Sequence, residues 1–488
     1  MKKVIIYTLL AVATTFRIDC GGVTGPTGPD GRGSVGPATG VHLTQAQFGA
    51  VGASTYTTVV LNKKSVYTVT EDLSFTAGST GDIIIDIQSD NVTLDLNQKN
   101  ISSTRASTNL TAINVVSGLQ NIVIKNGKIQ SIEGTGIVVG TSCQNVTIED
   151  VYLESCDYGG ISVSTSKNIK VNGVNSVNHT APTATDVYGL SLASCTNVDI
   201  LNSNFNDNGA TSKTGIGITL SSCSNSNIQN CNTSGNNGTS AYGIRLTACT
   251  VMNISSCYSK NNTATTGTAA GIHFSSASTD NVIEACEAMY NRATGTGGNA
   301  FGLYSTGGTS NIFDRCVAAG QIATTGIAFG AGLDSSETLS TISNGSFYGN
   351  RVSSTGQAYG VRFASTGVSV TKCCLRDCNI KSNSATTATA ILAGFRDWST
   401  DCNSLISGNV MALNGDGRLT IGSAPNFDID SSDLSIDGSG NGGLNLYLTY
   451  TDSKNVVDMV VETDVSNLQA VSTALQGWTN ILIVPSEV

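Results

Sequence analysis

The sequence has little charge, few aromatic residues and few prolines. Charged residues make up 12% of its 488 residues and aromatic residues 6%, and there are 6 prolines and 3 histidines. The formal net charge is −10, and no basic run is longer than Lys63-Lys64. A chain without a basic patch is not expected to bind nucleic acid or anionic membranes. Beyond the N-terminus no apolar run is long enough to cross a bilayer, so we expect no transmembrane segment in the mature chain.

Glycine and small polar residues are abundant and regularly arranged. The chain contains 54 glycines, and Val, Ile and Leu recur at regular intervals among Ser, Thr, Asn and Ala. A chain of this length exceeds one ordinary hydrophobic core. The regular spacing predicts one elongated repeat structure rather than a disordered linker.

The first forty residues differ from the rest. Residues 1–20, MKKVIIYTLLAVATTFRIDC, combine two lysines, an apolar run and an Ala-Val-Ala site. This pattern predicts a signal peptide region and a secreted or cell-surface protein. Residues 21–40 contain GVTGPTGPDGRGSVGP, a collagen-like Gly/Pro segment. Because its triplets are few and break register, we favour an extended linker; a short trimerising stalk, and hence a homotrimer, is the alternative.

A repeat with a period of 24 to 31 residues is visible from about residue 110. Each unit starts with Gly-apolar-x-apolar, as in GISV and GIRL, and continues with a second apolar segment such as NVTI or NVDI. This alternation predicts short strands. The repeat glycines are Gly136, Gly160, Gly189, Gly217, Gly243, Gly271, Gly302, Gly332 and Gly360.

An asparagine recurs at one place in the unit, eight residues beyond the last apolar residue of the second strand. Three short strands cannot bury their apolar faces alone, so successive units must stack. We therefore predict an all-β, right-handed parallel β-helix of about 12 coils, with a corner ladder of hydrogen-bonded asparagines. The ladder positions are Asn208, Asn236, Asn262, Asn291, Asn350 and Asn383, with His179 and Gln321 in equivalent places.

The repeat resembles that of the pectin-lyase-like superfamily in its generic β-helix form. Residues 89–102, SDNVTLDLNQKNIS, resemble an early coil of such proteins, and the resemblance covers roughly residues 60–412. We expect an N-terminal cap and first coil at 41–89, the β-helix at 90–412, and a C-terminal cap or small α+β module at 413–488. The superfamily includes lyases, hydrolases, epimerases, phage tailspikes and passive adhesins, so the resemblance implies a fold and no single activity.

None of the superfamily's catalytic signatures that we compared is present. Galacturonan hydrolases of this fold carry Asn-Thr-Asp, Asp-Asp, Gly-His-Gly and Arg-Ile-Lys motifs, and pectate lyases carry Arg-x-Pro-x-x-Arg; the sequence contains none of these. No catalytic residue therefore carries over from those families. Three histidines also leave little capacity for general acid–base catalysis.

The first strand of each unit has an outward residue two positions after its glycine. In five consecutive units this residue is charged, polar or aromatic: Arg245, His273, Tyr304, Asp334 and Arg362. At β spacing the row is about 20 Å long. Arginines suit uronate carboxylates and a tyrosine suits a sugar ring, so the row predicts a substrate-binding strip for an oligosaccharide. An ordinary solvated strand face is the structural alternative, and Asp334 and His273 are the candidates for catalysis.

Other residues have both structural and functional interpretations. His179 is expected to be a hydrogen-bonded corner residue rather than a general base acting with Asp186. Calcium, the one cofactor that the sequence suggests, has its candidate ligands in the acidic run 428–437, which lacks the glycine of an EF-hand loop. These ligands are Asp428, Asp430, Asp433 and Asp437. Four aromatic residues that precede repeat glycines predict a stacked structural row or a contact edge, namely Tyr188, Tyr242, Phe301 and Tyr359.

Most of the 14 cysteines fall into two columns. Residues stacked in adjacent coils lie about 4.8 Å apart, whereas the Cβ atoms of a disulfide prefer about 3.8 Å. We therefore expect buried free thiols, with strained disulfides after export as the alternative and a metal site disfavoured. One column contains Cys143, Cys195, Cys223 and Cys249, and the other Cys231, Cys257, Cys286, Cys316 and Cys378.

The sequence as a whole favours an exported, non-catalytic β-helix protein with a surface, structural or adhesive role, whose partner is a glycan or another surface component. The alternative is a polysaccharide lyase or glycoside hydrolase, including a tailspike-like depolymerase, that acts on acidic polysaccharide. Two carboxylates, or a base and an arginine, beside the predicted row would favour the enzyme.

Overall fold

The fold below is that of the unit Gly40–Val488 in a computed structural model. The description covers residues 40–49, 57–75, 83–103, 109–181, 185–210, 212–334, 337–354 and 356–364, and then 373–376, 378–381, 384–385, 391–397, 405–407, 410–412, 428–429, 435–437, 459–463 and 481–485. After Arg362 the described side chains are those of Cys373 and Cys378. The predicted signal region, the collagen-like segment and the side chains of the predicted calcium ligands lie outside the described residues.

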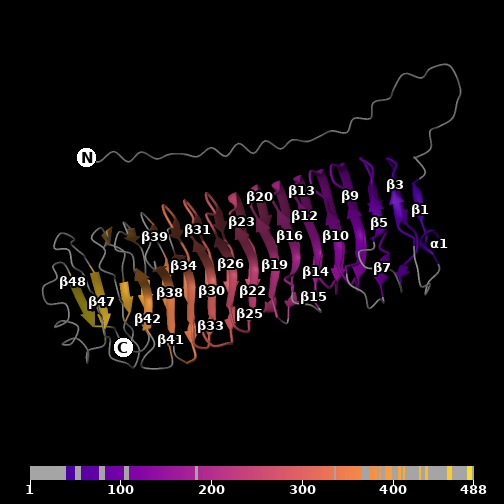
Figure 1. Ribbon diagram of the computed structural model, residues 1–488. Coiled ribbons are helices and arrows are strands. Elements are labelled where there is room, and N and C mark those ends of the chain that lie inside the picture. Colours follow the sequence, from indigo (N-terminus) through magenta and orange to yellow (C-terminus); the bar gives the residue numbers. More distant parts are fainter. Residues whose placement is uncertain are drawn as a thin grey trace, which may run out of the picture. The chain divides into compact units, whose positions relative to one another are not determined.

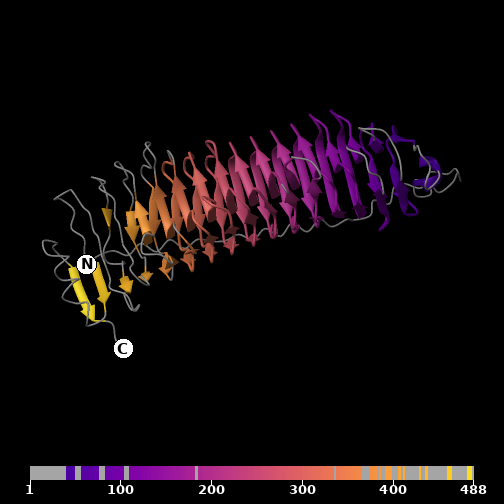
Figure 2. The same ribbon diagram turned by 60° about the horizontal axis from the view of Figure 1, so that its bottom comes forward.

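Parallel strands stack along one direction, from β1 to β48 (Figure 1, Figure 2). Two sheets form the larger faces. The 13-stranded sheet contains β2 (Val59–Leu61), β5 (Ile83–Ile87), β8 (Thr111–Val115), β10 (Thr135–Val139), β12 (Gly159–Ser164), β16 (Val187–Ala193), β19 (Thr214–Ser221), β22 (Ser240–Thr247), β26 (Thr268–Ser275), β30 (Asn299–Thr306), β34 (Ile327–Asp334), β38 (Gln357–Ala364) and β42 (Ile391–Asp397). The 18-stranded sheet contains β1 (Val41–Leu43), β3 (Val66–Val69), β4 (Leu73–Phe75), β6 (Thr93–Asp95), β7 (Asn100–Ser103), β9 (Gln120–Gln130), β11 (Gln144–Glu154), β13 (Lys167–Asn172), β14 (Asn175–Val177), β17 (Thr196–Leu201), β20 (Ser224–Gln229), β23 (Thr250–Ser255), β27 (Val282–Glu284), β31 (Ile312–Asp314), β35 (Thr341–Ser343), β39 (Cys374–Arg376), β43 (Leu405–Ser407) and β45 (Asp428–Ile429).

Two smaller sheets complete the coil, and one short helix lies near its start. The 8-stranded sheet contains β15 (Thr180–Ala181), β18 (Gly209–Ala210), β21 (Asn237–Gly238), β25 (Thr263–Ala264), β29 (Arg292–Ala293), β33 (Ile322–Ala323), β37 (Arg351–Val352) and β41 (Ser384–Ala385). The 9-stranded sheet contains β24 (Tyr258–Lys260), β28 (Glu287–Met289), β32 (Val317–Ala319), β36 (Ser346–Tyr348), β40 (Asn379–Lys381), β44 (Val410–Ala412), β46 (Ser435–Asp437), β47 (Met459–Thr463) and β48 (Ile481–Pro485). The helix α1 (Gln45–Phe48) packs Phe48 against Phe75, with ring centroids 5.5 Å apart.

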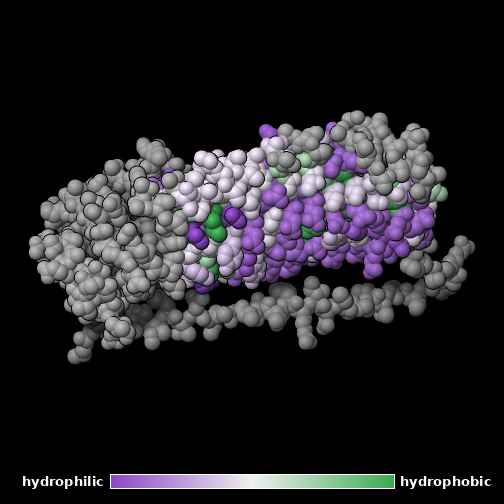
Figure 3. Space-filling model, turned by 90° about the horizontal axis from the view of Figure 1, so that it is seen from below, coloured by the Kyte–Doolittle hydropathy of each residue, from purple (hydrophilic) through white to green (hydrophobic). Residues whose placement is uncertain are grey.

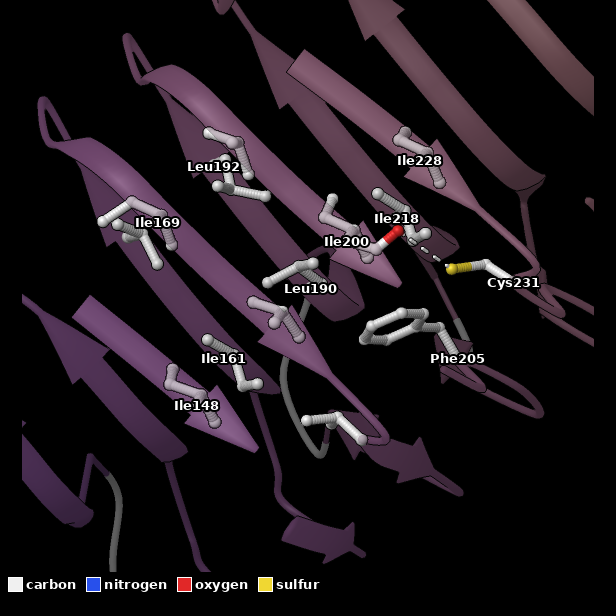
Figure 4. Packing of buried hydrophobic residues seen from close by; sticks show 14 of the residues in the cluster. Ile148, Ile161, Ile169, Leu190, Leu192, Ile200, Phe205, Ile218, Ile228 and Cys231 are labelled. Carbon is white, nitrogen blue, oxygen red and sulfur yellow. Dashed lines mark hydrogen bonds between the residues drawn. The ribbon is translucent and has the colours of Figure 1, made fainter. Parts of the chain in front are cut away.

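Alternating residues of each strand form the core. In β16, Leu190 and Leu192 are buried and Ser191 between them is half-buried. The register pairs Ile161 with Leu190 and Leu190 with Ile218, so apolar side chains stack in columns along the coil axis (Figure 4). Burying one such side chain contributes about 1.5–3 kcal/mol. Stacking therefore stabilises units that would not fold alone.

The corners turn at residues with left-handed backbone, and asparagine is the most frequent of these because it adopts this conformation more readily than most other non-glycine residues. At one exposed corner φ is 58° at Asn121, 55° at Asn145 and 55° at Asn168. The Nδ2 of Asn145 donates to Oδ1 of Asn121 over 2.9 Å, and Asn168 donates to Asn145 over 2.8 Å. Backbone conformation and coil-to-coil amide bonds thus favour the same residue.

A second asparagine ladder is buried, and it is the one that the repeat predicted. The Nδ2 of Asn208 donates to Oδ1 of Asn236 over 2.9 Å, and Asn236 donates in the same way to Asn262. Asn291 continues the ladder and donates to Oε1 of Gln321 over 3.0 Å. The predicted ladder is confirmed over these coils; Asn383 lies outside the described residues.

The eleven cysteines whose side chains are described are free thiols, and all are buried. They donate to backbone carbonyl oxygens, as Cys231 Sγ does to Ile200 O over 3.6 Å (Figure 4). The pKa of Cys257 is raised to about 12, first by its hydrogen bond to Cys231 and also by burial. These contacts fit small, unreactive core residues.

The predicted architecture is confirmed: the described chain is nearly all β and winds as a right-handed parallel β-helix. In the part of the chain that the structure describes, no helix is both long and apolar enough to cross a membrane. One face, drawn in Figure 3, is strongly hydrophilic over the earlier coils and closer to neutral over the later ones.

Candidate functional site

A column of stacked glycines, named the bend, interrupts the register of the 13-stranded sheet. The register of β30 and β34 pairs Phe301 with Phe329 and Leu303 with Ala331, and it leaves out the glycines between them. A Cβ on Gly302 would lie 2.4 Å from Gly330 O and 2.5 Å from the Cβ of Ala318, so no side chain fits there. On the two sides of the bend, the ring centroids of Phe301 and Tyr304 lie 4.5 Å apart.

Four of the five predicted strip residues occupy one register row. The row runs from Arg245 in β22 to His273 in β26 and Tyr304 in β30, and it reaches Arg362 in β38. All four side chains are half-buried. In β42 the next register position is that of Arg396.

The predicted place of Asp334 in the row is wrong. In β34 the residue paired with Tyr304 and Arg362 is Gly332, and Asp334 pairs with Thr306 and Ala364. The reason is that Gly330, and not Gly332, occupies the bend.

The side chain of Asp334 nevertheless joins the row. Tyr304 Oη donates to Asp334 Oδ2 over 3.1 Å, and Arg362 Nη1 lies 3.6 Å from the same oxygen. The side chains of Asp334 and Arg362 are each 13% exposed, so this ion pair is largely shielded from water. The structure therefore brings together Tyr304, Asp334 and Arg362.

Phe329 lies beneath this polar cluster, and the sequence analysis did not select it. A Cβ on Gly332 would be 2.6 Å from the Phe329 ring, so the ring fills the place of the side chain that glycine lacks. The Arg362 guanidinium lies 6.0 Å from the centre of this ring, and Phe329 is fully buried. Aligning Phe329 with Phe301 and Tyr359 would have found it, because each precedes the glycine of its coil.

An aromatic stack occupies the earlier half of the row. His273 lies between Tyr242 and Tyr304, with centroid distances of 5.4 and 5.1 Å and interplanar angles of 15° and 8°. The Arg245 guanidinium lies 5.1 Å from the centre of the Tyr242 ring. The stack covers ring faces, so a ligand meets ring edges and polar atoms here rather than a ring face of Tyr304.

Buried polar atoms without partners are concentrated in this row. Among the described side chains five such atoms occur, and three belong to the row: Arg245 Nε, His273 Nδ1 and Arg362 Nε. Burial, and to a lesser degree the charge of Arg245, lowers the pKa of His273 to about 3, so the imidazole is neutral at pH 7. Burial also raises the pKa of Tyr304, as does the neighbouring Asp334 carboxylate. The row thus offers two guanidinium groups, one carboxylate and a neutral imidazole.

His179 lies inside the coil, away from this row. Its Nδ1 accepts from Cys156 N over 3.0 Å, and its Nε2 is 2.8 Å from Ser176 Oγ, which donates to Gly189 O. The expected structural role of His179 is confirmed. Among the described residues no group of three or more His, Cys, Asp or Glu side chains is placed to hold a metal ion. The side chains of the predicted calcium ligands lie outside the described residues.

Comparison with known proteins gives matches to solved structures alone. No family model matches the chain, and no curated protein matches it. The A-module of mannuronan C-5 epimerase AlgE4 from Azotobacter vinelandii is 11% identical with a TM-score of 0.45, and the match covers 85% of this chain and 99% of that one. A double mutant of the tailspike protein of E. coli bacteriophage HK620, in complex with a pentasaccharide, is 10% identical with a TM-score of 0.41, and the match covers 85% of this chain and 80% of that one.

A third match is a double mutant of the periplasmic alginate epimerase AlgG. It is 13% identical with a TM-score of 0.43, and the match covers 84% of this chain and 83% of that one. Identities this low carry no residue roles over to this chain. The stacked parallel strands and the corner ladders give this chain the fold of a right-handed parallel β-helix.

Proposed function

We propose that this protein binds a glycan along the outer face of the 13-stranded sheet, from Arg245 to Arg362, and holds it without cleaving it. The observation that carries the proposal is the set of three buried, unpartnered nitrogen atoms on this row. A buried polar atom without a partner costs about 1–3 kcal/mol, so a row of them is expected to have a function such as ligand binding.

The polar groups of the row suit the hydroxyl and carboxylate groups of a sugar chain. Arg245 and Arg362 carry positive charge on a chain whose net charge is −10, and Asp334 accepts hydrogen bonds. Four register steps separate the two arginines, a length of about 19 Å. An extended oligosaccharide running along the coil axis fits this length.

The carboxylates bonded to the row among the described side chains favour binding over hydrolysis. Asp334 is the single carboxylate among the described residues that bonds to the row, and it is engaged by Tyr304 and Arg362. Glycoside hydrolysis by the common mechanisms uses two carboxyl groups about 5–9.5 Å apart. The imidazole of His273, in turn, is held between two tyrosine rings.

An oligosaccharide panel tests the proposal. Binding to the full chain is measured by calorimetry, and the incubated sugars are analysed for new reducing or unsaturated ends. We expect binding that Arg362→Gln weakens about tenfold or more, with no new ends. Arg292→Gln in β29 is the matched control, since Arg292 is exposed on the 8-stranded sheet. New ends that depend on Asp334 or His273 would replace this proposal with the lyase or hydrolase alternative.

We further propose that the protein is exported and acts at a surface. Residues 1–20 support this proposal through their signal-like pattern. Intact-mass measurement of protein recovered from outside the producing cells tests it. The full mass, with residues 1–20 retained, would count against export by a cleaved signal.

A further inference from the structure

The positive charges at the two ends of the row have different surroundings. Among the described residues no carboxylate forms an ion pair with Arg245, whose guanidinium lies against Tyr242. Arg362 lies 3.6 Å from the Asp334 carboxylate, which also accepts from Tyr304. The Arg245 end therefore carries an unneutralised positive charge, whereas the charge at Arg362 is offset by its neighbour.

This difference decides where a ligand's negative charge is accepted. A carboxylate that approaches Tyr304 and Arg362 meets the Asp334 carboxylate, and two like charges a few ångströms apart in a shielded site repel strongly. A sugar hydroxyl in the same place can donate to Asp334 and accept from Arg362. A carboxylate next to Arg245 meets a guanidinium that forms no ion pair with an acid among the described residues.

We propose that Asp334 is a specificity-determining residue, and that the strip selects a sparsely charged glycan. One anionic group is held at Arg245, and a neutral, hydroxyl-rich stretch lies along Tyr304, Asp334 and Arg362. A continuous polyuronate is disfavoured, because it places a carboxylate against Asp334. The inference deepens the proposed function and rests on it.

Three oligosaccharides of equal length test the inference, with calorimetry on the full chain. They are a neutral hexasaccharide, a hexasaccharide with one terminal glucuronate, and hexagalacturonate. We expect the wild type to bind the singly charged sugar most tightly. Asp334→Asn is expected to tighten hexagalacturonate binding about tenfold, and Arg245→Gln to weaken binding of the singly charged sugar about tenfold without weakening that of the neutral sugar.

Matched variants separate a local effect from a change of net charge. Asp199→Asn removes one exposed carboxylate from the 18-stranded sheet, and Arg292→Gln removes one exposed guanidinium; neither is expected to shift any of the three affinities. Arg396 stays unchanged in all proteins. Circular dichroism confirms that each variant is folded.

The outcomes distinguish the two proposals. If hexagalacturonate binds the wild type most tightly, or Asp334→Asn leaves its affinity unchanged, the selectivity inference is wrong while glycan binding stands. If the folded wild type binds none of the three sugars, glycan binding itself fails and this inference fails with it.

Discussion

Replacing His179 by asparagine is expected to remove a large part of the acid sensitivity of the fold. The side chain is fully buried, and burial lowers the pKa of His179 from 6.5 to about 3. Its Nδ1 accepts a hydrogen bond from Cys156 N, so the ring must be neutral at this atom. A proton added to Nδ1 would face a backbone N–H and destroy that bond.

The sign and size follow from proton binding in the two states. The unfolded chain binds the proton with the ordinary pKa of 6.5, while the folded chain resists it down to about pH 3. The stabilisation is therefore complete above pH 6.5 and is lost as the pH falls toward 3. Between pH 7.5 and pH 5.0 the unfolding free energy falls by about 2 kcal/mol, because pH 5.0 lies about 1.5 pH units below the ordinary pKa of histidine.

Asparagine is the matched replacement because the same column uses it in other coils. Asn236 Oδ1 accepts from Asn208 N over 3.2 Å, the contact that His179 Nδ1 makes with Cys156 N. The assay is urea unfolding at pH 7.5 and pH 5.0, with hydrogen exchange of the peptide that contains Cys156. We expect wild type to lose about 2 kcal/mol more than His179→Asn on acidification. The exposed His42→Asn serves as control, and equal losses in all three proteins would refute this reasoning.

Three further predictions concern the fold. Asn236→Ala leaves the backbone N–H and the side-chain amide of Asn208 without their acceptor. It should lower the free energy of unfolding, measured in urea, by about 2–4 kcal/mol. The control Asn227→Ala, at an exposed position, should lower it by less than about 1 kcal/mol. Equal effects would contradict the buried ladder. Gly302→Ala should lower the stability by about 1–3 kcal/mol, seen as a lower melting temperature, because its Cβ would overlap Gly330 O; an unchanged melting temperature would contradict the bend. The eleven described thiols should resist Ellman's reagent in the native protein and react in guanidinium chloride, and fast native labelling of peptides containing Cys223 or Cys257 would disprove the buried columns.

The columns of the coil could be predicted because spacing along the chain translates directly into position around the coil. Counting from the second strand identified the buried ladder through Asn208 and Asn236, and it placed His179 in it. It also identified the cysteine columns, because residues at the same distance from the second strand of their units stack in adjacent coils. To predict such a position, one needs to know only where the residue lies within its repeat unit.

The candidate site was harder to predict because its contacts depend on side chains reaching between coils. The unit FGAGLD contains two glycines, and the prediction from sequence that Gly332 is the repeat glycine is wrong. The structure selects Gly330, because Phe329 then pairs with Phe301 and Ala331 with the buried Leu303. The ring of Tyr242 reaches His273 of the next coil, where its own register partner is a small alanine. The spacing of residues within one unit does not predict such contacts between coils.

Mapping where a bound glycan protects the protein tests whether the glycan lies along the 13-stranded sheet. The protein is saturated with a binding oligosaccharide, and side-chain protection from hydroxyl radicals is read peptide by peptide. We expect protection at Arg245, His273, Tyr304 and Arg362, with no change on the exposed corner around Asn145 and Asn168. Saturable binding with protection on the 18-stranded sheet, and none on the row, would contradict it.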